Sequence, residues 1–344
     1  MQYSTFAAID IGSYDVILEI FEISKKQGIR SVDKICHRME LGKDTYTLGK
    51  IRPEMEEELC RVLADFVRIM EGYRVDDYRA TASSAISEAS NSLYVLGKIH
   101  QLTGLSVTVL SNSEQRFLSY KALAAMEDNF NKIIEKGTAI LDLDGGSFQI
   151  SLFDKDALVT TQNIRMGSLR IRERLAGIQS ETEHYEEMVE ELIWNEVSSF
   201  KKMYLKDRKI ENIMLIGDVF TDSVYQNIEE KTTKIISREN FNTWYEKIIH
   251  QSPMELAVKL GIPLENASLM YPSAVIYKCL IDMMGAEHIW IPGVHMTRGI
   301  AYEYAEQMKL LKGGHNFEND ILMAAKNIGK RYAAVSYTHL RAHE

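Results

Sequence analysis

The sequence predicts an α/β protein made of two similar lobes, and three observations support this fold class. A chain of 344 residues is too long for one small core and suits two domains of ordinary size. A strand–turn–strand pattern occurs twice, around residues 6–23 and again around residues 138–153. Mixed strand and helix patterns follow each occurrence. An internal repeat of this kind indicates two lobes that face each other across a cleft, each contributing one glycine turn.

Composition narrows the class of protein further. The apolar fraction of 45% and the charged fraction of 26% are typical of a soluble globular protein. No stretch approaches ~18 consecutive apolar residues, and the N-terminus lacks a signal-peptide pattern, so we expect no membrane span and no secretion. Three cysteines without C-x-x-C spacing indicate a reducing compartment, and we expect the cytoplasm. A net charge of −9 argues against nucleic-acid binding but allows a local site for a polyanion built from backbone amides.

The first half of the chain alternates strand and helix patterns. Apolar runs over residues 6–11 and 16–23 predict two strands joined by a tight turn, and residues 34–41 can supply a third. Pro53 opens a segment with apolar residues at helical spacing, which predicts a helix over residues 54–71. Shorter patterns predict strands at residues 78–82 and 106–110 and helices at residues 87–103 and 113–125.

The second half begins with another pair of strands and then becomes mainly helical. Residues 138–142 and 148–153 predict strands on either side of a Gly-Gly turn, and residues 157–163 continue the sheet. Further helices are predicted at residues 166–175, 181–204, 241–250, 253–260, 271–284 and 299–312, with strands at residues 212–216 and 289–291.

Domain boundaries follow from this order. Residues 1–125 are predicted to form the first lobe, and residues 126–312 the second lobe with a closing helix. Residues 316–334 begin a further helical segment, which then breaks off. Residues 335–344 do not continue that pattern, and we expect them to be a non-native tail.

Two turns that combine an acidic residue with glycine form the candidate site. The first is Asp10-Ile11-Gly12-Ser13, in which glycine lets backbone amides approach an anion and the carboxylate can hold a divalent cation. The second is Asp142-Leu143-Asp144-Gly145-Gly146-Ser147. A single turn of this kind is at least as often an ordinary hairpin turn as a phosphate-binding site. A pair of them, each opening a repeat, is typical of the phosphate clamp of the actin-like ATPase fold.

Several segments, taken in order, resemble the exopolyphosphatase / guanosine pentaphosphate phosphohydrolase (Ppx/GppA) family. Residues 6–13 resemble its A-A-I-D-I-G-S-N-S motif, and residues 84–91 its S-A-I-R-E-A-S-N motif. Residues 109–118 are similar to I-S-G-x-E-E-A-R-L, and residues 140–149 to D-I-G-G-G-S-T-E. The resemblance covers about residues 5 to 330. It implies two ribonuclease-H-like lobes of the actin-like ATPase type with an interlobe cleft, followed by the start of a helical domain.

The resemblance also implies a function and a set of site residues. The family hydrolyses terminal phosphoanhydride bonds of polyphosphate, or the 5′-phosphate of guanosine pentaphosphate, using Mg²⁺. The implied ligand is therefore polyphosphate or guanosine penta- or tetraphosphate, and a homodimer is left open. By family position, the residues implied are Asp10 and Asp142 for the metal, Gly12, Ser13, Gly145, Gly146 and Ser147 for phosphate, and Glu114, Gln115 and Gln149 for catalysis. Asp144 stands where the family has glycine, and its carboxylate is a further candidate ligand of the metal.

The chain departs from the family at several of these positions. The second Glu of I-S-G-x-E-E-A is the family's general base, and Gln115 stands there. Glutamine cannot accept a proton near neutral pH, although it can orient water by hydrogen bonds. Glu114 precedes it, but adjacent helical side chains point about 100° apart. Gln149 replaces a second carboxylate, Ser87 replaces an arginine, and Asp144 places a negative charge where the family has glycine.

Two functions fit these observations. The first is a working phosphohydrolase, with Asp10 and Asp142 on the metal and Glu114 or Gln115 placing water. The second is a catalytically degenerate phosphate- or nucleotide-binding sensor or scaffold, favoured because losing a general base alone costs about 10²–10⁴ in rate. A kinase or ATPase of the wider superfamily is less favoured, because no adenosine-binding motif is visible. The side chain that points at the glycine turns, Glu114 or Gln115, discriminates between the first two.

Overall fold

The computed structural model describes residues 3–126, 130–155, 157–176, 185–206, 208–227 and 234–311, with a few single positions between 322 and 329. The predicted start of a C-terminal domain (316–334) therefore lies almost wholly outside the described residues, and the predicted tail (335–344) lies entirely outside them. Among the described residues, no helix is both long enough and apolar enough to cross a membrane.

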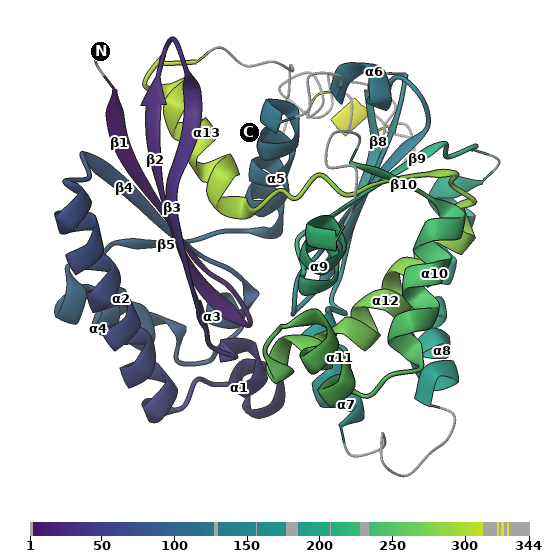
Figure 1. Ribbon diagram of the computed structural model, residues 1–344, viewed down its shortest axis with the longest axis horizontal. Helices are drawn as coiled ribbons and strands as arrows, with labels where there is room; N and C mark the ends of the chain where they lie inside the picture. Colours follow the sequence, from purple (N-terminus) through teal and green to yellow (C-terminus); the bar gives the residue numbers. More distant parts are fainter. Residues whose placement is uncertain are drawn as a thin grey trace.

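Two mixed β-sheets form the cores of two lobes (Figure 1). The first sheet has the strand order β3-β2-β1-β4-β5, and the second has the order β10-β11-β9-β6-β7-β8. The strands of the first sheet are β1 (Ser4–Ile11), β2 (Asp15–Ser24), β3 (Gly28–Arg38), β4 (Asp77–Ala82) and β5 (Val107–Val109). Those of the second are β6 (Thr138–Leu143), β7 (Phe148–Asp154), β8 (Ala157–Ile164), β9 (Asn212–Ile216), β10 (Ile235–Ser237) and β11 (His288–Trp290).

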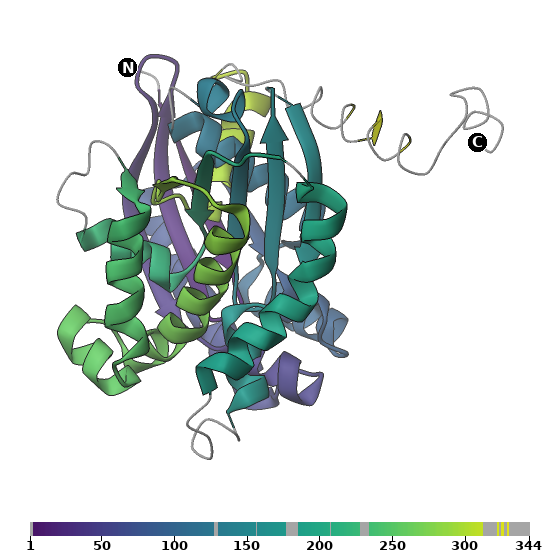
Figure 2. The ribbon, with the colours of Figure 1, turned by 90° about the vertical axis from the view of Figure 1, so that its right-hand side faces the viewer.

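Helices cover these sheets. The first half of the chain contributes α1 (Leu41–Leu48), α2 (Pro53–Tyr73), α3 (Ser84–Ser87), α4 (Ser92–Thr103), α5 (Asn112–Met126) and α6 (Phe130–Ile134). The second half contributes α7 (Ser168–Leu175), α8 (Tyr185–Phe200) with the π-helix η1 (Lys201–Leu205), α9 (Val219–Asn227), α10 (Arg238–Ile249), α11 (Pro253–Leu260), α12 (Leu264–Met284) and α13 (Met296–Gln307). Helices of the second lobe, teal to green, lie across the outer face of its sheet (Figure 2).

The internal repeat predicted from the sequence is present in the strand pairing. In each lobe, the opening strand pairs antiparallel with the next strand and parallel with a later one, as β1 does with β2 and β4, and β6 with β7 and β9. Asp10 and Asp142 lie near the ends of β1 and β6, where the parallel neighbours also end. The repeat therefore brings the two carboxylates to equivalent places, and the predicted two-lobed α/β fold is confirmed.

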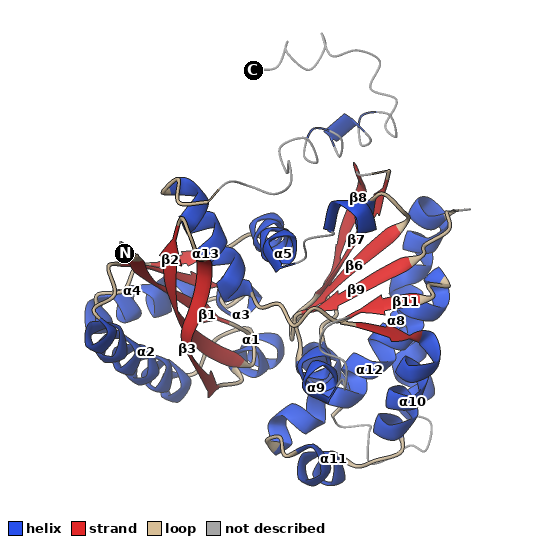
Figure 3. Ribbon diagram, turned by 45° about the horizontal axis from the view of Figure 1, so that its top comes forward, coloured by secondary structure: helices blue, strands red, loops and turns tan. Residues whose placement is uncertain are grey.

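Two helices connect the lobes. α13, which follows the second lobe in the chain, packs on the first sheet, where the Tyr304 ring stacks on Phe6 with centroids 4.1 Å apart. α5 contributes Leu118 to this cluster and Leu123 to the core of the second lobe. Both helices lie between the two sheets (Figure 3). Gln115 and Ser119 of α5 and Met296 at the start of α13 line a cavity between the lobes.

Some elements differ from the sequence predictions. The helix expected at residues 87–103 begins later, at Ser92, and the short helix α3 precedes it. Asn91, just before α4, exchanges two hydrogen bonds between its side chain and the backbone of Ile51. α12 begins seven residues earlier than expected and accommodates Pro272 in its interior. Helices α1 and α9 were not predicted; α1 packs against α3 of the first lobe and α7 of the second.

Candidate functional site

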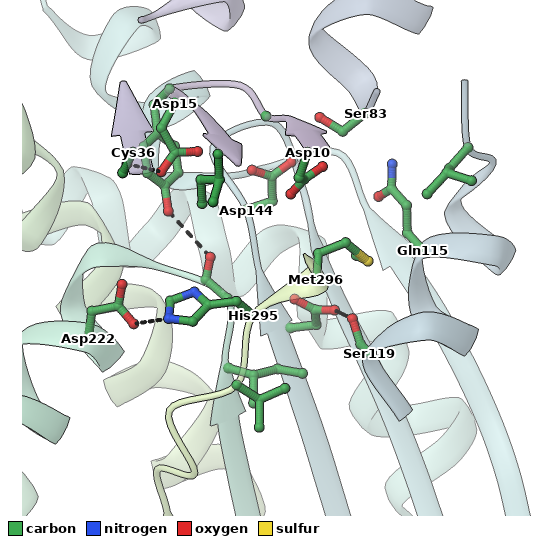
Figure 4. Close-up of a pocket in the computed structure, with 18 of the residues that line it drawn as sticks. Asp10, Asp15, Cys36, Ser83, Gln115, Ser119, Asp144, Asp222, His295 and Met296 are labelled. Atoms are coloured by element: carbon green, nitrogen blue, oxygen red, sulfur yellow. Dashed lines mark hydrogen bonds and ion pairs between the residues drawn. The ribbon is translucent and has the colours of Figure 1, made fainter. Parts of the chain in front are cut away.

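A cleft with a cavity of about 180 Å³ lies between the lobes, at the ends of the two hairpins (Figure 4). It collects residues from β1, β3, α5, β6, β7, α9 and the segment leading into α13. Of the residues predicted for the site, the cleft is lined by Asp10, Gly12, Gln115, Asp142, Asp144, Ser147 and Gln149. Side chains separated by more than 130 residues of sequence therefore converge because the two strand ends face each other.

Carboxylates dominate the electrostatics of this cleft. Burial raises the pKa of Asp10 to about 8, and repulsion from Asp15 and Asp144 adds to the rise. Burial raises the pKa of Asp142 to about 6, although the hydrogen bond that Ser119 Oγ donates to it at 2.7 Å opposes the shift. Burial also raises the pKa of Asp144. The protein alone compensates these charges poorly, which favours a bound cation among them.

The first turn of α5 separates the two candidate catalytic side chains. Gln115 is only 8% exposed and extends into the cleft (Figure 4). Glu114 turns away and accepts hydrogen bonds from the backbone N–H and the hydroxyl of Ser111, at 2.8 and 2.7 Å. It lines a separate cavity beside β4 and β5. A role for Glu114 in placing water is therefore not supported by its position, because it caps its own helix.

Gln149 offers an unsatisfied polar group to the cleft. It lies on β7 opposite Asp142 and is 5% exposed. Its Oε1 is buried and has no hydrogen-bond partner among the described residues. A buried amide oxygen without a partner is costly in a protein interior, so this atom fits a ligand, water or cation in the cleft.

Three residues predicted to bind phosphate do not line the cleft. Ser13, Gly145 and Gly146 are buried where the two lobes touch. A Cβ on Gly145 would lie 3.0 Å from the Ser13 Cβ, and a Cβ on Gly146 would overlap the Tyr46 hydroxyl. Direct contact between the glycine turns therefore replaces the open phosphate clamp that the sequence suggested. Ser87, at the family's arginine position, is exposed and also lies outside the cleft.

The opposite wall of the cleft contains residues that sequence reasoning missed. Asp15 accepts from Arg38 Nη1 at 2.9 Å, and His295 Nε2 lies 3.6 Å from Asp222 Oδ1. Lys34 also lines this wall, because alternate residues of β3 face the cleft. Asp15 stands in the first predicted turn and could have been found there, whereas nothing in the sequence around His295 distinguishes it.

The carboxylate oxygens of the cleft are the donor type that Mg²⁺ prefers. No group of three His, Cys, Asp or Glu among the described residues is arranged to hold a metal ion by itself. Mg²⁺, however, usually takes one or two protein carboxylates and completes its octahedron with water and phosphate oxygens. Asp10, Asp142 and Asp144 all line the cavity, so one or two of them can supply such oxygens, and the residues present fit Mg²⁺ shared with a phosphate ligand.

Comparison with solved structures places this fold. The chain superposes on an exopolyphosphatase from Cytophaga hutchinsonii with a TM-score of 0.79, 17% identity and coverage of 88% of this chain and 98% of that one. It superposes on the Ppx/GppA family member of Aquifex aeolicus with a TM-score of 0.70, 18% identity and coverage of 89% and 99%. At these identities the likeness shows the fold, which is the two-lobed actin-like fold predicted from the sequence.

Comparison with curated sequences identifies relatives and a family. The chain is 22% identical over 304 residues to the bifunctional 3-dehydroquinate synthase/phosphatase of Fusobacterium nucleatum, covering 82% of this chain and 44% of that protein. It is 25% identical over 144 residues to exopolyphosphatase 1 of Mycobacterium leprae, covering 42% and 41%. The chain thus matches less than half of the length of each relative. A sequence profile described as the Ppx/GppA phosphatase family matches residues 19–308, most of the chain, and the protein therefore belongs to that family.

Proposed function

We propose that the cleft binds a phosphoanhydride ligand, polyphosphate or guanosine penta- or tetraphosphate, together with Mg²⁺, and that its hydrolytic chemistry is largely lost. One observation carries the proposal: the cleft receives Gln115, while the carboxylate of Glu114 is used to cap a helix. Relative to a glutamate at the same place, a glutamine there is expected to lower the rate by about 10²–10⁴.

The residues of the cleft have separate roles in this proposal. One or two of the carboxylates of Asp10, Asp142 and Asp144 would hold Mg²⁺, which would supply positive charge between these carboxylates and the ligand phosphates. The backbone at Gly12 and the hydroxyl of Ser147 face the same cavity and can donate to phosphate oxygens. The side-chain amides of Gln115 and Gln149 can each donate and accept hydrogen bonds, so they can orient water or phosphate without taking a proton.

The comparisons support the chemical class of the ligand. Family membership is shown, and the named relatives include exopolyphosphatases and a bifunctional protein with a phosphatase activity in its name. We extend the phosphoanhydride ligand to this chain on that basis, together with the acidic, oxygen-rich cleft.

A working hydrolase is the second candidate, and one observation favours it. His295 lines the cleft and has Asp222 as a neighbour, with Nε2 and Oδ1 3.6 Å apart. A histidine oriented by a carboxylate is a common general base. In this alternative, His295 takes the proton of the attacking water, and the His295→Gln variant loses turnover.

Calorimetric titration with tripolyphosphate tests the primary proposal. Wild-type protein is expected to bind in the presence of Mg²⁺ and to bind at least tenfold more weakly in EDTA. Asp142→Asn should weaken the Mg²⁺-dependent binding, whereas Asp65→Asn, on the exposed face of α2, should not. Absence of binding by wild-type protein would refute the proposal. Rapid phosphate release that His295→Gln abolishes would favour the hydrolase instead.

A further inference from the structure

The Tyr46 hydroxyl lies directly on the second glycine turn. Tyr46 belongs to α1, which follows the first hairpin, and Gly146 belongs to the second lobe. A Cβ on Gly146 would overlap both the Tyr46 hydroxyl oxygen and Ser84 Oγ. The missing side chain of Gly146 therefore makes room for a tyrosine of the same chain, and the turn is covered by protein instead of opening into the cleft.

Two serine hydroxyls surround the Tyr46 hydroxyl at hydrogen-bond distance. Tyr46 Oη hydrogen-bonds Ser13 Oγ and Ser84 Oγ, both at 2.8 Å. Burial raises the pKa of Tyr46, so the group stays a neutral hydroxyl at physiological pH. Two serine hydroxyls that meet at a backbone turn without a Cβ provide donors and close approach, which is what a phosphoryl oxygen requires.

An arginine completes these surroundings. The Arg170 guanidinium carbon lies 3.9 Å from the centroid of the Tyr46 ring, and Arg170 Nε donates to the carbonyl of Gly146 at 2.8 Å. Arg170 Nη2 donates to Glu88 Oε2 at 2.9 Å. A guanidinium stacked on the covering ring places positive charge beside the turn, and this charge offsets part of the negative charge of Asp144 at the hydroxyl.

Asp144, one of the carboxylates assigned to Mg²⁺, lies beside the serine hydroxyls that contact Tyr46. Asp144 Oδ2 accepts from Ser13 Oγ at 3.3 Å. Its charge would oppose a phosphate at the turn unless a cation were shared between them. Binding at this turn should therefore depend on Mg²⁺, as binding in the rest of the cleft does.

We propose that the Tyr46 hydroxyl occupies a phosphoryl-oxygen subsite formed by Ser13, Ser84 and Gly146, and that a ligand phosphate reaches this subsite by displacing it. The inference rests on the proposed function, which supplies the phosphoanhydride ligand. It makes Tyr46 a residue that lowers affinity for ligands whose phosphates extend from the cleft to the second turn.

Calorimetric titration with tripolyphosphate and Mg²⁺ compares the wild type with Tyr46→Phe and Tyr73→Phe. Removing the Tyr46 hydroxyl abolishes its two hydrogen bonds with the serines, so we expect binding about tenfold tighter in Tyr46→Phe. Tyr73→Phe is the matched control, because its hydroxyl donates to Asp33 on the exposed surface, and its affinity should be unchanged. Equal affinity in Tyr46→Phe and wild type, or weaker binding in Tyr46→Phe, would overturn the inference.

Hydrogen exchange of the wild-type protein provides a second readout that needs no variant. Displacing Tyr46 releases an anchor of α1, so exchange in residues 41–48 should become faster when tripolyphosphate and Mg²⁺ bind. Ligand binding with unchanged or slower exchange there would contradict the displacement while leaving the proposed function intact. If neither wild-type protein nor Tyr46→Phe binds the ligand, the proposed function fails and the inference fails with it.

Discussion

Adjacent side chains at the start of α5 have opposite surroundings. Gln115 lies in the cleft with Asp10 and Asp142, whereas Glu114 bonds Ser111 in a reciprocal arrangement that closes the end of the helix. The capping bonds also lower the pKa of Glu114, so its carboxylate is stabilised in the charged form away from the cleft. A rotation of about 100° between neighbours on a helix thus decides which chemical group faces the ligand.

Asp218 is a second residue whose environment has a measurable consequence. Its side chain is buried at the start of α9, accepts from Thr221 N at 3.1 Å and lies 3.2 Å from the Tyr277 hydroxyl. Burial raises its pKa to about 7. The folded state therefore holds this proton more tightly than the unfolded chain, in which the carboxyl has its ordinary pKa near 3.8.

We expect the free energy of unfolding to fall as pH rises from about 4 to about 7, because ionising Asp218 costs more in the folded state. Asp218→Asn removes this contribution, which is on the order of a few kcal/mol, and should give a flatter pH dependence. Urea denaturation of both proteins at several pH values measures the two slopes. Parallel slopes would show that Asp218 titrates normally. The substitution itself can change the free energy of unfolding by an amount that does not depend on pH, and comparing the slopes against pH removes that amount.

At the scale of elements, the contact between α5 and α13 shapes the cleft. Gly299 of α13 lies against the backbone of Leu118 in α5, and a Cβ there would overlap the Leu118 carbonyl oxygen. The two helices can approach this closely only with glycine at this position. The first sheet, α13 and α5 thus form one packed unit that carries Gln115 into the cleft.

Gly299→Ala is expected to destabilise the protein by about 1–3 kcal/mol, because the added methyl group forces the helices apart. Gly97→Ala is the control, since Gly97 lies within α4 and its Cβ would meet no atom within 4 Å. That variant should be neutral or more stable by up to about 1 kcal/mol, because alanine favours the helix. Chemical denaturation measures both. Equal effects of the two substitutions would contradict the packing described for α13.

Helices and strands whose apolar residues recur at regular spacing were predictable from the sequence. Elements that depend on contacts between distant parts of the chain were not. The strands β1, β2, β6 and β7 and the amphipathic helix α2 have strong apolar patterns and were placed within a few residues. α1 is short and mostly polar in sequence, yet it packs against α3 of the first lobe and α7 of the second. The packing of α13 on the first sheet joins residues almost 300 positions apart, and no local pattern reports such a contact.

At the scale of the molecule, ion pairs between the lobes, most of them partly buried, hold the lobes together. Arg172 of α7 donates to both carboxylate oxygens of Glu40, at 2.7 and 2.8 Å, and also to Glu173. Arg170 and Arg165, from the second lobe, both pair with Glu88 of the first. These contacts fix the relative position of the glycine turns, so they also keep Tyr46 on Gly146.

Arg172→Met should lower the free energy of unfolding by about 3 kcal/mol, because it leaves Glu40 and Glu173 largely buried without their partner. Arg68→Met removes an exposed pair with Asp65 on α2 and should change stability by less than about 1 kcal/mol. Urea denaturation compares the two. A small effect at Arg172 would mean that other contacts hold the lobes.

The candidate site was only partly predictable from the sequence. Motif positions such as Asp10, Asp142 and Gln115 do meet in one cleft, because the repeat fixes where strand ends lie. Whether Gly146 faces a ligand or another side chain depends on the distance between the lobes, which no motif encodes. His295 joins the site only through the return of the chain from the second lobe to the first.

We propose that Gln115 in the cleft limits hydrolysis, and phosphate release from tripolyphosphate with Mg²⁺ tests this role most directly. Gln115→Glu should release phosphate at least about 10²-fold faster than wild-type protein, because a carboxylate then faces the ligand and can accept the proton of water. Glu114→Gln, whose side chain lies outside the cleft, is the control and should leave the rate unchanged. Wild-type turnover equal to or faster than that of Gln115→Glu would contradict the account.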